Sequence, residues 1–158
     1  MNEPDGPDRF FADYPDGLLV TIVRDPRQWL ASYLRHMDDE NSDGSVNLWM
    51  LSAEASLRAY ETRPDRVVVL LFEDLVHKTE AVMRMLCDRM TLEFRAELLE
   101  PTFNGMPVPS DSSHKPSLGI DHQVTERHHE ALEPEQLEQV TKTAMPKFEE
   151  IRDRFRVR

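Results

Sequence analysis

The sequence predicts an α/β fold built on a small parallel sheet, and three observations lead to this prediction. Two runs of six apolar or β-branched residues, 18–23 and 67–72, have the unbroken hydrophobicity of strands that are buried on both faces. Each run is followed by a segment whose apolar residues recur at helical spacing. The chain has 158 residues, enough for one domain with a substantial core. Alternation of strands and helices is typical of a parallel sheet covered by helices.

The first predicted strand leads directly into a helix. Arg24 ends the strand, and Asp25 and Pro26 are expected to be the N-cap and the first helical residue. Proline suits that position because its missing N–H is not needed there and its φ is already helical. The helix is expected over residues 26–36 and to bury the apolar side chains Trp29, Leu30, Tyr33 and Leu34. Ligands of open α/β sheets bind at the carboxyl ends of the strands, so this junction is the predicted binding edge.

The other elements follow from capping, spacing and proline positions. We expect a loose N-terminus over residues 1–9, with one helical turn at 10–14, an acidic loop over 38–45 and a helix over 47–61. After the second strand, Thr79 is predicted to cap a helix that ends at about Met90, and a short helix is expected over 93–99. Residues 101–118 form a predicted loop rich in proline and serine. A last helix begins at Glu133-Pro134, and Pro146 is expected to break or kink it.

Two strands make an incomplete parallel sheet. Each strand would expose one edge, and unpaired strand edges are avoided in stable proteins. We therefore expect that a strand belonging beside these two is absent from the sequence. A partner or a second copy of the chain could then cover the exposed edge.

Composition excludes several classes of function. The net charge of −11 argues against a nucleic-acid-binding surface. Residues 24–36 nevertheless hold three arginines against one aspartate, a local balance of +2 that suits a small anion. The single cysteine, Cys87, rules out an internal disulfide and fits a reducing compartment, so we expect a cytoplasmic protein. The first eight residues lack the pattern expected of a signal or transit peptide, and no apolar run in the sequence is long enough to span a membrane.

The strand–helix junction resembles a family motif. The run from Val23 to Arg27 together with Ser32 is similar to the 3′-phosphate motif of the sulfotransferases that use 3′-phosphoadenosine 5′-phosphosulfate (PAPS). That motif is an R-[ND]-P turn with a serine eight positions after the arginine. The resemblance implies a P-loop-NTPase-like parallel sheet, PAPS as co-substrate, and Arg24 and Ser32 as ligands of the 3′-phosphate. Arginine suits this role because it binds phosphate through bidentate, charge-assisted hydrogen bonds.

Two further segments resemble elements of the same family. Phe72-Glu73-Asp74-Leu75 is similar to a Y-E-D-L element that follows a central strand, with phenylalanine in place of tyrosine. The resemblance implies that the ring of Phe72 lies near the adenine. The segment from Asp111 to Glu135 resembles the closing part of many bacterial members, although Asp111, His114 and His128 depart from the family's Asn, Phe and Trp. It implies that Arg127 lies on the phosphate side of the nucleotide.

The resemblance covers residues 10–155 but only the second part of the family's fold. The glycine-rich loop that binds the 5′-phosphosulfate has no counterpart in the sequence, and neither does the usual catalytic base. The sequence therefore predicts one incomplete sulfotransferase domain, a fragment or truncated member without sulfotransfer activity of its own. The acceptor, a hydroxyl or an amine in this family, and the catalytic residues stay unassigned.

Simpler readings compete with each of these assignments. Arg24 could be an exposed arginine paired with Asp25 or another acid. Glu73 and Asp74 could form an acid/base pair, but adjacent carboxylates at a strand end more often cap the next turn. Four histidines with Asp121 do not have the spacing of a metal site (His114, His122, His128, His129). The alternative function is a non-catalytic nucleotide-binding or protein-interaction module.

Overall fold

The computed structural model describes residues 6–37, 42–109, 118–126 and 132–157. Its centre is a pair of parallel strands, β1 (Leu19–Val23) and β2 (Val67–Leu71), which pair in register from Leu19 opposite Val67 to Val23 opposite Leu71. The seven α-helices of the described residues are α1 (Gly6–Asp13), α2 (Pro26–Met37), α3 (Ser42–Thr62), α4 (Phe72–His77), α5 (Thr79–Met90), α6 (Pro134–Thr143) and α7 (Met145–Phe155). The α/β class with a parallel sheet is confirmed.

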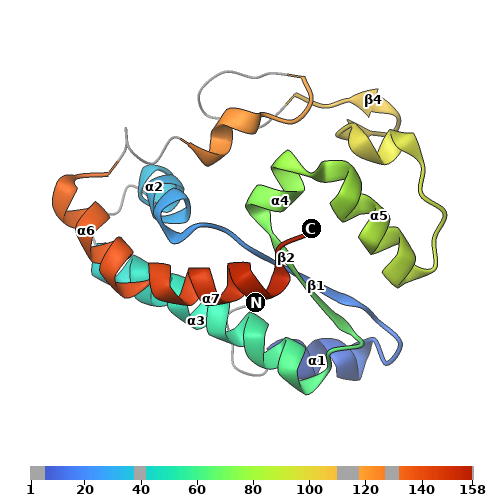
Figure 1. The fold of residues 1–158 in the computed structure, drawn as a ribbon. Coiled ribbons are helices and arrows are strands. Elements are labelled where there is room, and N and C mark those ends of the chain that lie inside the picture. The colour runs from blue at the N-terminus through green and yellow to red at the C-terminus, as the bar shows by residue number, and fades with distance from the viewer. Residues whose placement is uncertain (1–5, 38–41, 110–117, 127–131, 158) are drawn as a thin grey trace.

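Helices cover both faces of the strand pair. Figure 1 shows α3 and α7 on one side of the strands and α5 on the other. Side chains on one face of the sheet pack with α2, α3, α6 and α7 around the fully buried Leu30 and Ile151. Val68 and Leu70 on the other face pack against Val82 of α5. This two-sided cover explains why β2 is buried at all five positions, as the unbroken apolar run predicts.

The edge of β1 that faces away from β2 has no strand partner within the described residues. Ile22 on this strand is 55% exposed, although Leu19 and Val23 are buried. A groove of about 210 Å³ runs along the strand, and it is also lined by Pro7 of α1 and by small side chains at helical spacing on α3 (Ser52, Ala55, Ser56, Ala59). The described part of the chain therefore has the exposed sheet edge that the strand count predicts.

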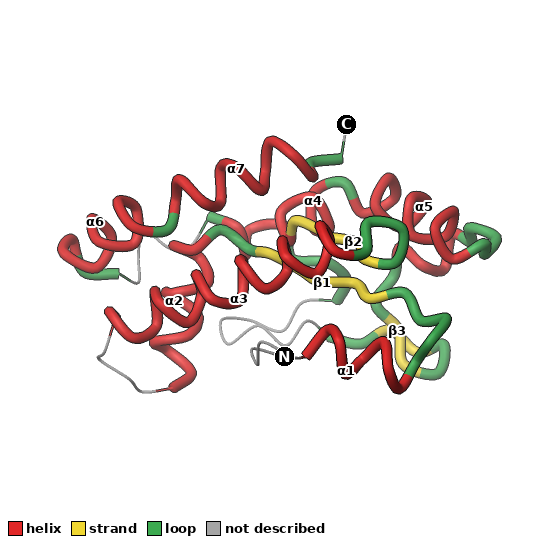
Figure 2. The backbone as a smooth tube through the Cα atoms, turned by 90° about the horizontal axis from the view of Figure 1, so that it is seen from below, coloured by secondary structure: helices red, strands yellow, loops and turns green. Residues whose placement is uncertain are grey.

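The helical boundaries differ from the sequence prediction at three places. The region predicted as loose, 1–9, contains the start of α1 at Gly6, and α3 begins at Ser42 inside the predicted loop 38–45. Phe72 begins α4 and does not end the strand, as Figure 2 also shows in the short helix after β2. Apolar periodicity identifies the middle of a helix well but carries less information about its first polar turn.

Thr79 does not cap α5. It is the first helical residue, and its hydroxyl donates to the carbonyl of Leu75 in the preceding helix at 2.7 Å. The prediction of a helix ending at Met90 is confirmed. The break near Pro146 is also confirmed, because α6 ends at Thr143 and α7 begins at Met145, where proline fits the first turn.

The region 101–118, predicted as a loop, contains a small hairpin. The strands β3 (Thr102–Phe103) and β4 (Met106–Pro107) pair antiparallel. Asn104 and Gly105 connect them with φ of 51° and 78°, which is the turn that an Asn-Gly pair favours. Near this hairpin, the expected short helix at 93–99 is a 3₁₀ turn, η1 (Ala96–Leu99).

Candidate functional site

Arg24 lies where the sequence predicts, immediately after β1 at the carboxyl edge of the sheet. Its side chain is half-buried, and its Nε is buried without a hydrogen-bond partner among the described residues. Burial lowers the pKa of the guanidinium, while the charges of Glu73 and Asp25 act in the opposite direction. The group stays cationic at neutral pH because arginine cannot lose its proton there.

Three neighbours hold Arg24. The ring of Phe72 lies under the guanidinium, with Cζ 4.6 Å from the ring centroid, a cation–π distance. Nη2 donates to the carbonyl of Val124 at 3.1 Å, and the indole Nε1 of Trp49 donates to the carbonyl of Arg24 at 3.0 Å. The side chain is thus fixed while Nε is left for another acceptor.

Asp25 is the N-cap of α2, as predicted. Its Oδ1 accepts from the backbone N of Arg27 at 2.9 Å, and its Oδ2 forms an ion pair with Arg27 at 2.6 Å. Hydrogen bonding to Asp25 raises the pKa of Arg27. Arg24 itself forms no ion pair within the described residues. Within the described residues, Asp25 thus pairs with Arg27 and not with Arg24, although its charge still acts to raise the pKa of Arg24.

Ser32 is half-buried on α2, six residues after Pro26 and therefore about 9 Å along the helix axis. Gln28 lies one turn before it on the same face, and the two are four residues apart, as are Arg24 and Gln28. The amide of Gln28 is buried and donates to the carbonyl of Thr125. Arg24 and Gln28 thus both contact the segment around Thr125, and Ser32 lies one helical turn beyond Gln28.

Glu73 connects the ends of the two strands. Its Oε1 accepts from the backbone N of Asp25 at 2.9 Å, and its Oε2 is buried without a partner among the described residues. Burial raises the pKa of this carboxyl, hydrogen bonds from the backbone of Asp25 and of Glu73 itself oppose the shift, and the charge of Asp25 adds to it. The attraction of Arg24 lowers it.

Asp74 contacts a different part of the chain. Its Oδ2 accepts from the backbone N of Val157 at 2.7 Å, and its Oδ1 pairs with Lys78 at 3.1 Å. Because Glu73 binds the β1–α2 turn and Asp74 binds the C-terminal segment, the two carboxylates do not form a joint acid/base pair. Both instead tie α4 to other segments, and neither caps α4, whose N-cap Leu71 has no side-chain cap hydrogen bond, so the capping interpretation is wrong.

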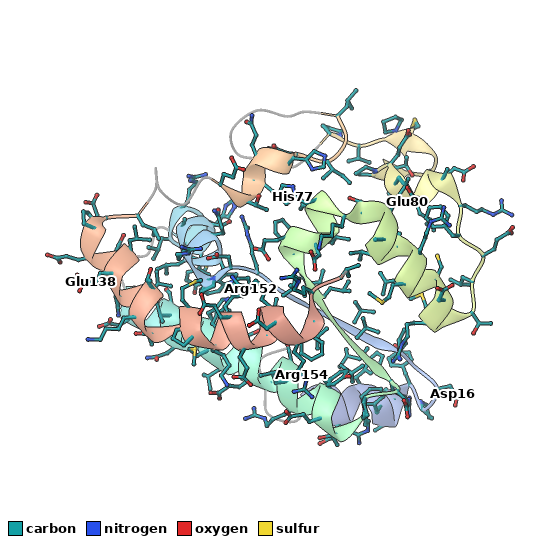
Figure 3. The ribbon with its side chains drawn as sticks, viewed as in Figure 1. Asp16, His77, Glu80, Glu138, Arg152 and Arg154 are labelled. Carbon is teal, nitrogen blue, oxygen red and sulfur yellow. The ribbon has the colours of Figure 1, made fainter. Side chains whose placement is uncertain are left out.

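A 3₁₀ turn, η2 (His122–Thr125), covers the carboxyl edge of the sheet. Besides its contacts with Arg24 and Gln28, its Thr125 Oγ1 lies 2.7 Å from Nε2 of His77 on α4. The rings of His77 and His122 are 5.7 Å apart. Figure 3 shows His77 on the side of α4 that faces this turn.

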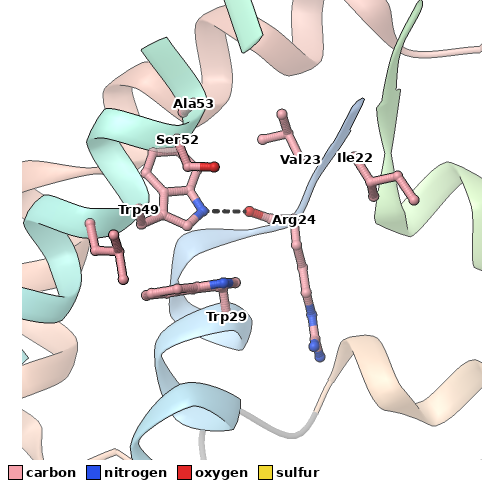
Figure 4. Close-up of a pocket in the computed structure, with 8 residues that line it drawn as sticks. Ile22, Val23, Arg24, Trp29, Trp49, Ser52 and Ala53 are labelled. Atoms are coloured by element: carbon pink, nitrogen blue, oxygen red, sulfur yellow. Dashed lines mark hydrogen bonds between the residues drawn. The ribbon is translucent and has the colours of Figure 1, made fainter. Parts of the chain in front are cut away.

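A small pocket lies beside Arg24, between the end of β1, α2 and α3. It has a volume of about 180 Å³ and is lined by Ile22, Val23, Arg24, Trp29, Leu48, Trp49, Ser52 and Ala53. Figure 4 shows the guanidinium of Arg24 extending away from Trp49 and Ala53. Sites for whole drug-sized ligands occupy roughly 300–1,000 Å³, so this pocket is smaller than a site for a complete ligand of that size.

Several residues named from the sequence cannot be placed. Arg127, Asp111, His114, His128 and His129 lie outside the described residues. Within the described part of the chain no group of three His, Cys, Asp or Glu side chains could hold a metal ion. In the same part, no helix has the length and apolar character that crossing a membrane requires.

The sequence analysis missed two residues that shape the site. Gln28 is a buried amide on the same helical face as Ser32, and its place one turn before that residue was the available signal. Trp49 is a buried core residue within the helix predicted over 47–61, and its indole N–H also fixes the end of β1. No local pattern reveals that second contact, because it joins residues 25 positions apart.

The sulfotransferase family matches residues 8–96, which is more than half of the chain. The chain therefore belongs to the sulfotransferase family. The matched region contains Arg24, Ser32 and the segment from Phe72 to Leu75, but not the segment from Asp111 to Glu135. Among curated proteins, none matches this chain.

Two solved structures are similar in fold. One is a sulfotransferase domain from the curacin biosynthetic pathway, with a TM-score of 0.68 and 20% identity over 89% of this chain and 58% of that domain. The other is the sulfotransferase domain of the Synechococcus PCC 7002 olefin synthase, with a TM-score of 0.64 and 23% identity over 88% of this chain and 55% of that domain. The chain thus spans little more than half the length of either domain.

Proposed function

We propose that this chain provides the 3′-phosphate half-site of a PAPS-dependent sulfotransferase. The observation that carries the proposal is the half-buried guanidinium of Arg24 at the carboxyl edge of the sheet, fixed by its neighbours but with Nε unsatisfied. A phosphate oxygen is the acceptor that this donor lacks, and arginine binds phosphate strongly. Ser32 is proposed to donate its hydroxyl to the same phosphate.

The nucleotide partner is proposed to be PAPS, or the product 3′,5′-adenosine bisphosphate after sulfonate transfer. In the complete reaction an acceptor hydroxyl or amine attacks the sulfonate in line while a base removes its proton. Arg127 is proposed to approach the phosphate side, and Phe72 the adenine. The guanidinium of Arg24 covers one face of the Phe72 ring, so the adenine would contact the edge of the ring or its other face. The single buried cysteine supports a cytoplasmic location.

Binding of two nucleotides by calorimetry tests the half-site. We expect 3′,5′-adenosine bisphosphate to bind at least about tenfold more tightly than adenosine 5′-monophosphate, because only the first carries a 3′-phosphate; tenfold is about 1.4 kcal/mol. Equal affinities would contradict the assignment of the 3′-phosphate to this site.

The chain alone is proposed not to transfer sulfonate. Its residues supply neither a recognisable glycine-rich phosphosulfate loop nor an assigned base. We expect no release of 3′,5′-adenosine bisphosphate when the purified 158-residue chain is incubated with PAPS and a mixture of phenols and amines. Turnover that rises in proportion to protein concentration would contradict this.

A non-catalytic interaction module is the second candidate function, and the exposed edge of β1 favours it. Ile22 is 55% exposed and the groove beside it is walled by small side chains on α3, so another backbone has room to pair there. A partner strand or a second copy of the chain would satisfy the edge. A chain that pairs with a protein partner but does not bind 3′,5′-adenosine bisphosphate would favour this role over the first.

A further inference from the structure

The buried carboxylate of Glu73 lies beside the proposed phosphate site, and the mechanism above gives it no role. It lies two residues after the end of β2, Arg24 lies one residue after the end of β1, and the register of the strands places these ends side by side. Oε1 is held by the backbone N of Asp25, while Oε2 has no partner among the described residues. Arg24 Nε, a donor, is also unsatisfied.

These two unsatisfied atoms do not satisfy each other. The charges of Arg24 and Glu73 attract, yet no ion pair joins them within the described residues. A phosphate bound at Arg24 would accept from Nε, but it would also bring negative charge close to a buried carboxylate. Two like charges at close range cannot both persist at low cost in a partly dehydrated site.

We propose that Glu73 takes up a proton when a phosphate binds beside Arg24 and then donates a hydrogen bond to that phosphate through Oε2. The inference rests on the proposed function, because it needs a phosphate at Arg24. The proton comes from solvent, and no covalent bond changes. Glu73 would thus be a positioning residue whose protonation links nucleotide affinity to pH.

Other charged groups surround Glu73 and stay in place when it alone is changed. Arg24 at the end of β1 and Asp25 at the start of α2 act on it directly, and the further charged groups on the neighbouring elements are Arg27 on α2, Asp74 and His77 on α4, His122 on η2, and Glu149 on α7. Burial already raises the pKa of Glu73, so a nearby phosphate has only to extend an existing shift. A Glu73→Gln variant keeps the shape and the acceptor for Asp25 but cannot titrate.

The test is calorimetric titration of 3′,5′-adenosine bisphosphate into the wild-type chain and into Glu73→Gln, between pH 6 and 8, in two buffers of different ionisation enthalpy. The buffer dependence of the heat counts protons taken up on binding. We expect the wild type to take up more protons on binding than the variant does. We also expect the ratio of the wild-type Kd to the variant Kd to rise with pH, by up to about tenfold per pH unit. Glu80→Gln, an exposed glutamate on α5, is the matched control and should behave as the wild type.

The outcomes separate this inference from the proposed function. Equal proton uptake in wild type and Glu73→Gln would overturn the role of Glu73 and leave the phosphate site intact. Absence of binding in the wild type at every pH would overturn the phosphate site and this inference with it. If the variant does not fold, the ¹³C shift of the Glu73 carboxyl in the wild type, with and without nucleotide, reports the same protonation; a shift unchanged by nucleotide overturns the proposal.

Discussion

Ser32, in the second turn of α2, is proposed to donate its hydroxyl to the same phosphate as Arg24. A hydrogen bond to a charged group contributes about 1.5–3 kcal/mol, so Ser32→Ala should weaken binding of 3′,5′-adenosine bisphosphate by about tenfold or more. Calorimetry measures the loss. Thr62→Ala removes an exposed hydroxyl that bonds within α3 and should leave the affinity unchanged. Equal affinities for Ser32→Ala and wild type would remove Ser32 from the site.

The buried carboxyl of Glu73 makes a separate prediction for the free protein. Because its pKa is raised on folding, the folded chain binds more protons than the unfolded chain between the two pKa values. The wild-type stability contributed by this group is therefore full below the unfolded pKa and is lost as pH rises through the folded pKa. Glu73→Gln should match the wild type near pH 4 and exceed it at neutral pH, by the order of 1 kcal/mol that single substitutions commonly give. Urea unfolding at both pH values measures the difference; a constant difference would contradict it.

At the scale of elements, α3 fixes the end of β1 through one indole. Trp49 is buried and donates to the carbonyl of Arg24 at 3.0 Å. Trp49→Phe keeps an aromatic ring but loses this bond, and an unpaired buried carbonyl costs about 1–3 kcal/mol. We expect a lower urea midpoint and weaker nucleotide binding together. Tyr60→Phe on the same helix is the control, because it also removes one polar group from an aromatic ring but lies outside the pocket beside Arg24. If Trp49→Phe bound the nucleotide as tightly as the wild type, the hydrogen bond from Trp49 to Arg24 would have no role in nucleotide binding.

Elements with strong local signals could be predicted from the sequence, and those that depend on distant contacts could not. The strands around Val20 and Val69 and the helix start at Asp25-Pro26 carry their own apolar runs and capping chemistry. The short α4 has only six residues and is held by Glu73 and Asp74 bonding to segments 48 and 83 positions away. The hairpin around Gly105 has a local signal, the Asn-Gly pair, but the proline-rich composition of residues 101–118 led to the prediction of a loop.

The same division applies to the site. Arg24 could be placed at the sheet edge from its strand-end position alone, and Asp25 could be identified as a cap. The cover by η2 could not, because Val124 and Thr125 reach Arg24 and Gln28 through backbone carbonyls, which carry no sequence signal. Contacts between near neighbours in sequence, such as the cap bond from Asp25 to the backbone N of Arg27, were predictable; contacts that join distant segments through peptide groups were not.

At the scale of the whole molecule, the unpaired edge of β1 should drive association. An exposed strand edge with an apolar side chain such as Ile22 is a template for pairing with another chain. We expect the chain to self-associate at high concentration and Ile22→Lys to shift it toward monomer, as sedimentation velocity would measure. Leu51→Lys, an equally exposed apolar residue on α3, is the control. A wild type that stays monomeric at several hundred micromolar would contradict this expectation.

The central claim is that Arg24 binds the 3′-phosphate of an adenine nucleotide, and its removal tests the claim most directly. Calorimetry of 3′,5′-adenosine bisphosphate should show binding to the wild type and to Arg58→Ala, an exposed arginine toward the far end of α3. Arg24→Ala should lower the affinity by about a hundredfold, the loss expected for charge-assisted hydrogen bonds worth about 3 kcal/mol, while the fold is retained. Equal binding by Arg24→Ala and wild type would contradict the claim.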